Sequence, residues 1–271
     1  MRLLLTLLFV HMLRVGLAQD LHLYLLAGQS NAVGQGDSTL SPACVGGTAW
    51  EYAVERDVLL PLSDPFGRDE LMFQRAHTGS VAPALANALY KRTGKPVVLI
   101  AAARGGASCS RLAELDNCGT WDTQGNLLLM PAALQKVKAA GRKTGKSLQG
   151  VIWLQGERDA NAINDGKLTA DAYMQALESV IRRFREVCGR SLPFYIVQTG
   201  YYTGHPREGF DAVRQMQAAV AERDPYTFVV YSDTGSFAEK GWMRDPIHYN
   251  QTGLNQIGTV VAEAIVNNHH P

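Results

Sequence analysis

The stretch that decides the fold runs Leu21-His22-Leu23-Tyr24-Leu25-Leu26-Ala27 and continues directly into Gly28-Gln29-Ser30-Asn31. The first run is nearly continuous in apolar residues, as expected of a strand that is buried on both faces of a parallel sheet. The second run consists largely of turn residues and on its own indicates only a turn. Because it follows the carboxyl end of the strand, however, Ser30 lies where open α/β sheets place their ligands.

Apolar, strand-like runs alternate with helical patterns along the rest of the chain. The expected strands cover residues 21–27, 96–102, 149–155, 193–199 and 226–231. The expected helices cover residues 81–92, 131–143, 170–187, 210–222 and 252–266. This alternation predicts an α/β fold with a parallel sheet covered by helices on both faces.

One long stretch, residues 33–74, has no regular pattern and exceeds what a compact domain usually contains without a reason. It holds Trp50, Tyr52 and Phe66. Two interpretations stand equally: a wall of a substrate cleft, or a peripheral excursion whose aromatic side chains pack together. Further aromatic residues on predicted loops are of the kind that sugar-binding clefts use: Trp121, Tyr201, Tyr202, His205 and Trp242.

A second informative segment, Asp245-Pro246-Ile247-His248, lies near the C-terminus. Taken alone it is a common turn with a surface histidine. Together with Ser30 it supplies a nucleophile, a base and a carboxylate in the order Ser, Asp, His. A serine hydroxyl needs a base within hydrogen-bond reach and a third group that orients the base. A carboxylate three residues before the histidine, on a loop that proline stiffens, can hold the imidazole in this way.

Four ordered blocks carry a family resemblance: Ala27-Gly28-Gln29-Ser30-Asn31, Arg104-Gly105-Gly106-Ala107-Ser108, Trp153-Leu154-Gln155-Gly156-Glu157 and Asp245 to His248. The pattern resembles the SGNH (GDSL-like) hydrolases, in the variant found in the sialate O-acetylesterase and acetylxylan esterase group, carbohydrate esterase family 6. The resemblance implies a three-layer α/β/α sandwich with a five-stranded parallel sheet of the flavodoxin-like kind. It also implies a serine esterase that acts on acetylated carbohydrates.

The predicted site residues follow from both arguments. Ser30, Asp245 and His248 are the catalytic candidates. A tetrahedral intermediate needs preorganised hydrogen-bond donors for its oxyanion, and glycine lets a backbone N–H approach that oxygen closely. The candidate donors are the N–H of Ser30, the N–H of Gly105 or Gly106, and the side chain of Gln155. The role of Gln155 is implied by the resemblance. Supporting roles are assigned to Gln29, Asn31 and Glu157, and Glu157 either orients Gln155 or replaces Asp245 as the partner of His248.

Neighbouring residues leave further alternatives open. Arg158 is expected to pair with Glu157 or Asp159. The cysteines are Cys44, Cys109, Cys118 and Cys188, which allow three pairings; a bridge between Cys109 and Cys118 would stiffen the loop after Gly105-Gly106. Asn250-Gln251-Thr252 matches a glycosylation acceptor, but its position favours the start of a helix, with Asn250 or Thr252 as the cap.

Length and composition indicate one secreted domain. The 271 residues suffice for a single α/β domain. Residues 1–18, with Arg2 followed by an apolar run and a small-residue end, are predicted to be a signal peptide, which leaves residues 19–271 as one esterase domain with a secreted or periplasmic location. No membrane association is expected after cleavage.

Charge says little about partners beyond excluding nucleic acid, the resemblance implies an acetylated carbohydrate substrate, and no cofactor is predicted. The 26 basic and 25 acidic side chains give a net charge of +1 without the basic stripe that nucleic-acid binding needs. A phosphate-binding loop and a zinc helix are also missing from the sequence, and His269-His270 is interpreted as a solvated end rather than a metal site. Two alternative functions remain: a short-chain lipid or thioester acylhydrolase, and a non-catalytic carbohydrate-binding protein on the same scaffold. The acetylated sugar and the oligomeric state are not predicted.

Overall fold

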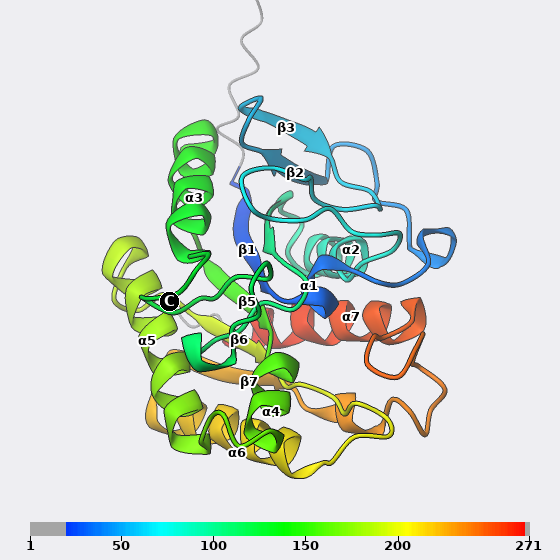
Figure 1. The fold of residues 1–271 in the computed structure, drawn as a ribbon. Coiled ribbons are helices and arrows are strands. Elements are labelled where there is room, and N and C mark those ends of the chain that lie inside the picture. Colours follow the sequence, from blue (N-terminus) through cyan, green and yellow to red (C-terminus); the bar gives the residue numbers. More distant parts are fainter. Residues whose placement is uncertain (1–19, 269–271) are drawn as a thin grey trace, which may run out of the picture.

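A seven-stranded sheet forms the middle layer of the structure, a computed structural model that describes residues 20–268 (Figure 1). The predicted signal peptide and His269-His270 lie outside the described residues. The strand order is β3-β2-β4-β1-β5-β6-β7. The strands are β1 (His22–Gly28), β2 (Ala49–Ala53), β3 (Val58–Pro61), β4 (Val97–Ala103), β5 (Gly150–Leu154), β6 (Phe194–Val197) and β7 (Thr227–Tyr231).

All five expected strands are present, but a sheet of five parallel strands is wrong. Strand β2 extends the sheet parallel to β4, and β3 pairs antiparallel with β2, so the sheet is mixed. The additional hairpin lies inside the stretch 33–74. The sequence pattern did not predict this hairpin, because both strands are short and because the buried Glu51 interrupts the apolar run of β2. Glu51 accepts a hydrogen bond from the backbone N–H of Gly67 and pairs with Arg68.

Helices cover both faces of the sheet, as predicted (Figure 1). One face carries α2 (Ala82–Thr93) and α7 (Gln251–Asn268), which pack against each other. The other carries α3 (Met130–Thr144), α5 (Ala170–Cys188) and α6 (Glu208–Arg223). Residues of β1 alternate between the two cores, with Leu23 and Leu25 in one and Tyr24 and Leu26 in the other. The shorter helices are α1 (Ser30–Val33), α4 (Glu157–Asn164), η1 (Ser38–Leu40), η2 (Arg111–Ala113) and η3 (Asp233–Ser236).

Two short helices, α1 and α4, place the chemistry at one edge of the sheet. Helix α1 follows the carboxyl end of β1, and α4 follows that of β5. Strand β1 lies between β4 and β5. After β1 the chain continues toward the β2 side of the sheet, and after β5 it continues toward the β6 side. Open α/β sheets bind ligands where neighbouring strands diverge in this way. Gly28 permits the turn into α1: its φ is 143°, and a Cβ there would come within 2.0 Å of the carbonyl oxygen of Leu154.

The structure answers several other expectations. Tyr52, Phe66 and Trp121 are buried, so none of them is an exposed wall of a cleft; Trp121 packs edge-on against Trp153 in the core. All four cysteines are free thiols, and the bridge between Cys109 and Cys118 is not formed. The backbone N–H of Gly253 donates to Oδ1 of Asn250, which confirms a helix start at that position.

None of the described helices combines the length and apolar character needed to span a bilayer.

Candidate active site

Ser30, His248 and Asp245 form one hydrogen-bonded chain. Nε2 of His248 lies 3.0 Å from Oγ of Ser30. Nδ1 of the same ring lies 2.7 Å from Oδ2 of Asp245. Ser30 is the first residue of α1, and its side chain sits at the carboxyl end of β1, whereas the other two residues come from the loop before α7. The serine is 8% exposed, so its hydroxyl is confined but not sealed from solvent. This arrangement can deprotonate the serine as it attacks a carbonyl.

Asp245 is kept ionised by its own loop. Oδ1 accepts hydrogen bonds from the backbone N–H groups of Ile247 (3.0 Å) and His248 (2.9 Å), while Oδ2 faces the imidazole. Partial burial raises the pKa of Asp245, but these backbone N–H groups and His248 outweigh it, and the pKa is lowered overall. A carboxylate that stays ionised can stabilise the imidazolium that forms during catalysis.

Asn31 fixes the loop that carries the base to the turn that carries the serine. Its Oδ1 accepts a hydrogen bond from the backbone N–H of Tyr249 (3.1 Å), and its Nδ2 donates to the carbonyl of Ile247 (3.3 Å). On its outer side the loop accepts a hydrogen bond at the carbonyl of Pro246 from the N–H of Thr203 (2.8 Å). His248 is therefore held from both flanks.

Glu157 contacts Asn31 rather than His248. Its Oε1 accepts a 2.7 Å hydrogen bond from Nδ2 of Asn31, and among the described residues the carboxylate hydrogen-bonded to the imidazole belongs to Asp245. Burial raises the pKa of Glu157, opposed by Asn31 and by the nearby His248. Glu157 thus braces Asn31 and, through it, the base loop. The expected pairing of Arg158 with an acidic neighbour is replaced by a 2.7 Å bond from its Nε to the carbonyl of Ala113.

The Gly105-Gly106 pair forms a turn beside the serine. The N–H of Ala107 donates to the carbonyl of Arg104 (3.1 Å), and Gly106 has a φ of 71°, as a type II turn requires at that position. A Cβ at Gly105 would lie 4.0 Å from Cβ of Ser30. The N–H of Gly105 already donates to Oε1 of Gln74 (2.7 Å). Within residues 20–268, the N–H groups of Gly106 and Ser30 have no hydrogen-bond acceptor.

Gln155 is fully buried, and its amide nitrogen is directed into the protein. Nε2 donates to Oδ2 of Asp159, to the carbonyl of Ala107 (3.2 Å) and to Oε1 of Gln29 (3.3 Å). Gln29 also accepts hydrogen bonds from the N–H groups of Gly156 and Arg158 at the start of α4. The amide hydrogens of Gln155 are therefore already used, and its role as an oxyanion donor stays a prediction.

Two residues near the site received no role from the sequence. Gln74 ends the irregular stretch and reaches Gly105 through tertiary contact alone, so no local pattern marks it. Asp159 accepts from the backbone of Cys109 and Ser110 and from Gln155. Gln155 precedes α4, which begins at Glu157, so its contact with Asp159 is not a helical pair, and no helical pattern marks it.

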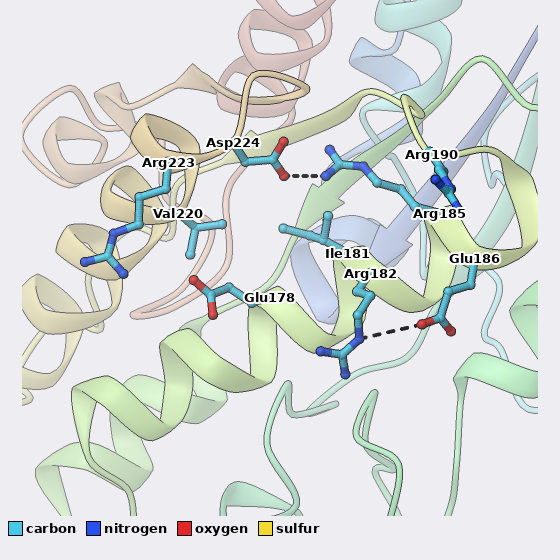
Figure 2. Close-up of a pocket in the computed structure, with 9 residues that line it drawn as sticks. All are labelled: Glu178, Ile181, Arg182, Arg185, Glu186, Arg190, Val220, Arg223 and Asp224. Carbon is cyan, nitrogen blue, oxygen red and sulfur yellow. Dashed lines mark hydrogen bonds and ion pairs between the residues drawn. The ribbon is translucent and has the colours of Figure 1, made fainter.

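Two hollows of the surface differ in position: one is remote from Ser30, and the other lies beside the loop that carries His248. One of about 660 Å³ lies between α5 and α6 and is drawn in Figure 2. Its lining contains two ion pairs, Arg185 with Asp224 and Arg182 with Glu186. It is near the ends of helices that lead into β6 and β7, far along the strands from Ser30. Another, of about 450 Å³, borders the catalytic loop at Arg244, and Leu40 is the one large apolar side chain in its lining.

Comparison with known proteins places the chain in a family. The sequence profile described as "Carbohydrate esterase, sialic acid-specific acetylesterase" matches residues 20–267. Among solved structures, a protein from Arabidopsis thaliana is similar with a TM-score of 0.72 and 21% identity, over 92% of this chain and 99% of that one. A carbohydrate acetylesterase from Xanthomonas citri is similar with a TM-score of 0.56 and 17% identity, over 92% of this chain and 57% of that one.

A lipase from a goat rumen metagenome shares the fold with a TM-score of 0.53 and 12% identity, over 92% of this chain and 97% of that one. No curated relative matches the chain. The family profile confirms the carbohydrate-esterase resemblance that the sequence motifs suggested. The chain belongs to the family of carbohydrate esterases described as sialic acid-specific acetylesterases. It is accordingly a carboxylic ester hydrolase of the carbohydrate O-acetylesterase type.

Proposed function

We propose that the protein is a secreted or periplasmic serine esterase that removes O-acetyl groups from carbohydrates through Ser30, His248 and Asp245. The observation that carries the proposal is the hydrogen-bonded chain from Oγ of Ser30 through His248 to Asp245. It lies at the carboxyl end of the central strand. Secretion rests on the apolar segment within residues 1–18.

The reaction proceeds in two half-reactions. As Oγ of Ser30 bonds to the acetyl carbon, Nε2 of His248 takes the hydroxyl proton. The tetrahedral intermediate then collapses, the bond to the sugar oxygen breaks, and His248 returns the proton to that oxygen. Water, deprotonated by His248, attacks the acetyl-enzyme and releases acetate and free Ser30. Asp245 stabilises the imidazolium in both halves.

The oxyanion is received by the free backbone N–H groups of Ser30 and Gly106. The first N–H belongs to the nucleophile itself, the second follows Gly105, which lies beside Ser30, and neither has an acceptor elsewhere in the described residues. The N–H of Gly105 becomes a third donor only if Gln74 releases it. The side chain of Gln155 joins the hole only if it gives up its present acceptors. Each preorganised donor of this kind lowers the barrier by about 3–4 kcal/mol.

A polar substrate suits the surface around the catalytic loop. The hollow beside Arg244 is lined by hydroxyl, carboxylate, amide and guanidinium groups, which match sugar hydroxyls better than an acyl chain. The half-buried ring of Tyr202 and the exposed ring of His205, stacked with centroids 3.6 Å apart, lie in the segment whose Thr203 contacts Pro246. Acetylated sialic acid and acetylated xylan are the first substrates to examine.

Acetate release by the wild-type protein and by Ser30→Ala tests the proposal. The substrates are acetylated sialic acid, acetylated xylan and p-nitrophenyl esters of increasing acyl length. We expect acetate from at least one glycan, a preference for the acetyl ester, and a loss of about a thousandfold or more in Ser30→Ala with an unchanged melting temperature. A folded Ser30→Ala protein that still releases acetate rules out the nucleophile. A preference for longer esters without glycan activity identifies a lipid or thioester acylhydrolase instead.

A further inference from the structure

Asp159 is a buried carboxylate that the reaction described above does not use. It lies on α4, its exposed fraction is 0%, and it accepts hydrogen bonds from the N–H of Cys109 (2.8 Å), the N–H of Ser110 (2.9 Å) and Nε2 of Gln155. These contacts are buried and span as many as 50 residues of sequence. Burying a carboxylate costs free energy, and this one has three hydrogen-bond donors but no bonded opposite charge to offset that cost. Side-chain packing alone does not require such a group in the core.

The segment that Asp159 holds is the continuation of the glycine turn. Residues 104–107 form the turn beside Ser30, and Cys109 and Ser110 follow after Ser108. Gln155, itself bonded to Asp159, also donates to the carbonyl of Ala107 at the end of the turn. The turn is thus fixed at its last residue through Gln155 and two residues later by Asp159. From other directions, the N–H of Gly105 is held by Gln74, and the N–H of Ser108 by the carbonyl of Gly119 (3.1 Å).

We propose that Asp159 is a positioning residue for the oxyanion site, and that its ionised carboxylate holds the turn so that the N–H of Gly106 faces the reacting carbonyl at Ser30. This inference rests on the proposed function. Asp159 touches neither the substrate nor the reacting atoms. Only an ionised carboxylate offers acceptors alone; a protonated acid or an amide would direct a hydrogen atom at one of three donors and push the turn away.

The surroundings make this arrangement dependent on pH. Burial raises the pKa of Asp159 to about 6, against the lowering effect of Cys109, Ser110, Gln155 and the charge of Arg158. The other titratable groups that face it are the thiol of Cys109, in the loop, and the hydroxyl of Tyr173, on α5, and burial raises the pKa of both. Glu157, at the start of α4, adds a second buried acid. Around neutral pH Asp159 is ionised, and in mild acid it gains a proton.

Asp159→Asn tests the inference, with Asp165→Asn as the matched control at the exposed end of the same helix. We expect the kcat of Asp159→Asn near neutral pH to fall by about tenfold to a hundredfold, with KM changed by less than about threefold, because the affected contact is made in the transition state. Asp165→Asn keeps the wild-type values.

The pH dependence separates positioning from simple packing. The ratio of wild-type to Asp159→Asn kcat is expected to shrink as pH falls below about 6, where wild-type Asp159 becomes protonated. Other pH-dependent steps of the reaction are common to both proteins and cancel in the ratio. A ratio that is constant with pH, a change confined to KM, or an unchanged kcat would each overturn the inference.

A measurement on the unmutated protein covers the case in which Asp159→Asn does not fold. Amide proton shifts of Cys109 and Ser110 are followed by NMR from neutral to acidic pH. We expect both to move with one common midpoint near 6, and the amide of Gly106 to follow them. Shifts that stay constant exclude a titrating Asp159. Because this readout needs no turnover, it remains valid even if Ser30→Ala shows that the proposed function is wrong.

Discussion

At the scale of single residues, two carboxylates compete for the role of orienting the base. Asp245 bonds to Nδ1 of His248, whereas Glu157 bonds to Asn31. We expect Asp245→Asn to lower kcat by about a hundredfold or more, because an amide cannot stabilise the imidazolium and can favour the wrong tautomer. Glu157→Gln keeps an acceptor for Asn31 and should lower kcat by less than about tenfold.

Steady-state kinetics of the two variants on one acetyl ester compare the two carboxylates. If Glu157→Gln loses more activity than Asp245→Asn, the carboxylates have been assigned the wrong way round.

Residue roles were predictable from the sequence where geometry is local. The three-residue spacing from Asp245 to His248 lets one loop set the carboxylate against the imidazole. Ser30 joins them across 218 residues of sequence and was indicated by its place after a strand and by the family resemblance. Gln74 could not be found, because it reaches Gly105 across 31 residues of intervening sequence and no motif encodes that approach. The resemblance directed Gln155 toward the substrate, whereas the buried Asp159 attracts its amide inward, a contact that depends on tertiary packing.

At the scale of elements, the β2–β3 hairpin depends on a buried ion pair. Nζ of Lys136, on α3, lies 2.6 Å from Oε1 of Glu70, and both side chains are essentially inaccessible. Glu70 also accepts hydrogen bonds from the N–H groups of Val54 and Glu55, which follow β2. One pair of charges therefore joins the hairpin to a helix on the face of the sheet.

Removal of one partner from this pair should destabilise the protein strongly. We expect Lys136→Met to lower the free energy of unfolding by about 3–5 kcal/mol, because Glu70 is left buried without its counter-charge. The double change Lys136→Met with Glu70→Gln should recover part of the loss. The exposed Lys138→Met on the same helix serves as control, and urea unfolding gives all four values. A loss no larger than that of Lys138→Met would show that the pair does not hold the hairpin.

The same hairpin marks the limit of pattern-based prediction for the elements. Each expected helix and strand is long or continuously apolar, as α5 and β4 are, and its pattern is therefore strong. Strands β2 and β3 are short, and a buried charge such as Glu51 is stabilised by partners distant in sequence. Helix α4 has only eight residues and starts with charged ones, so its pattern resembles that of a loop.

At the scale of the whole molecule, segments far apart in the chain meet around α4. Glu157 braces Asn31 and the base loop, Asp159 holds the glycine turn, and Gln29 caps the start of the helix. Both acids of α4 are buried, and burial raises the pKa of each. A raised pKa means that the folded protein binds the proton more tightly than the unfolded chain does. Activity needs the ionised form of Asp159, whereas folding favours the protonated form, so activity and stability respond to pH in opposite directions at this residue.

This opposition predicts a measurable pH term in stability. The contribution of Asp159 to folding is fully present below its ordinary pKa of 3.8 and is lost as pH rises through its folded value of about 6. The free energy of unfolding of the wild type relative to Asp159→Asn should therefore fall by about 2 kcal/mol between about pH 4.5 and about pH 7, at 1.36 kcal/mol per pKa unit. Other acids with lowered pKa values, such as Asp224 and Asp245, lose their contribution as pH falls, but they are common to both proteins and cancel in the difference. Urea unfolding of the two proteins at both pH values measures it. A difference that stays constant would mean that burial does not raise the pKa of Asp159, and one that rises with pH would mean that its hydrogen-bond donors lower the pKa instead.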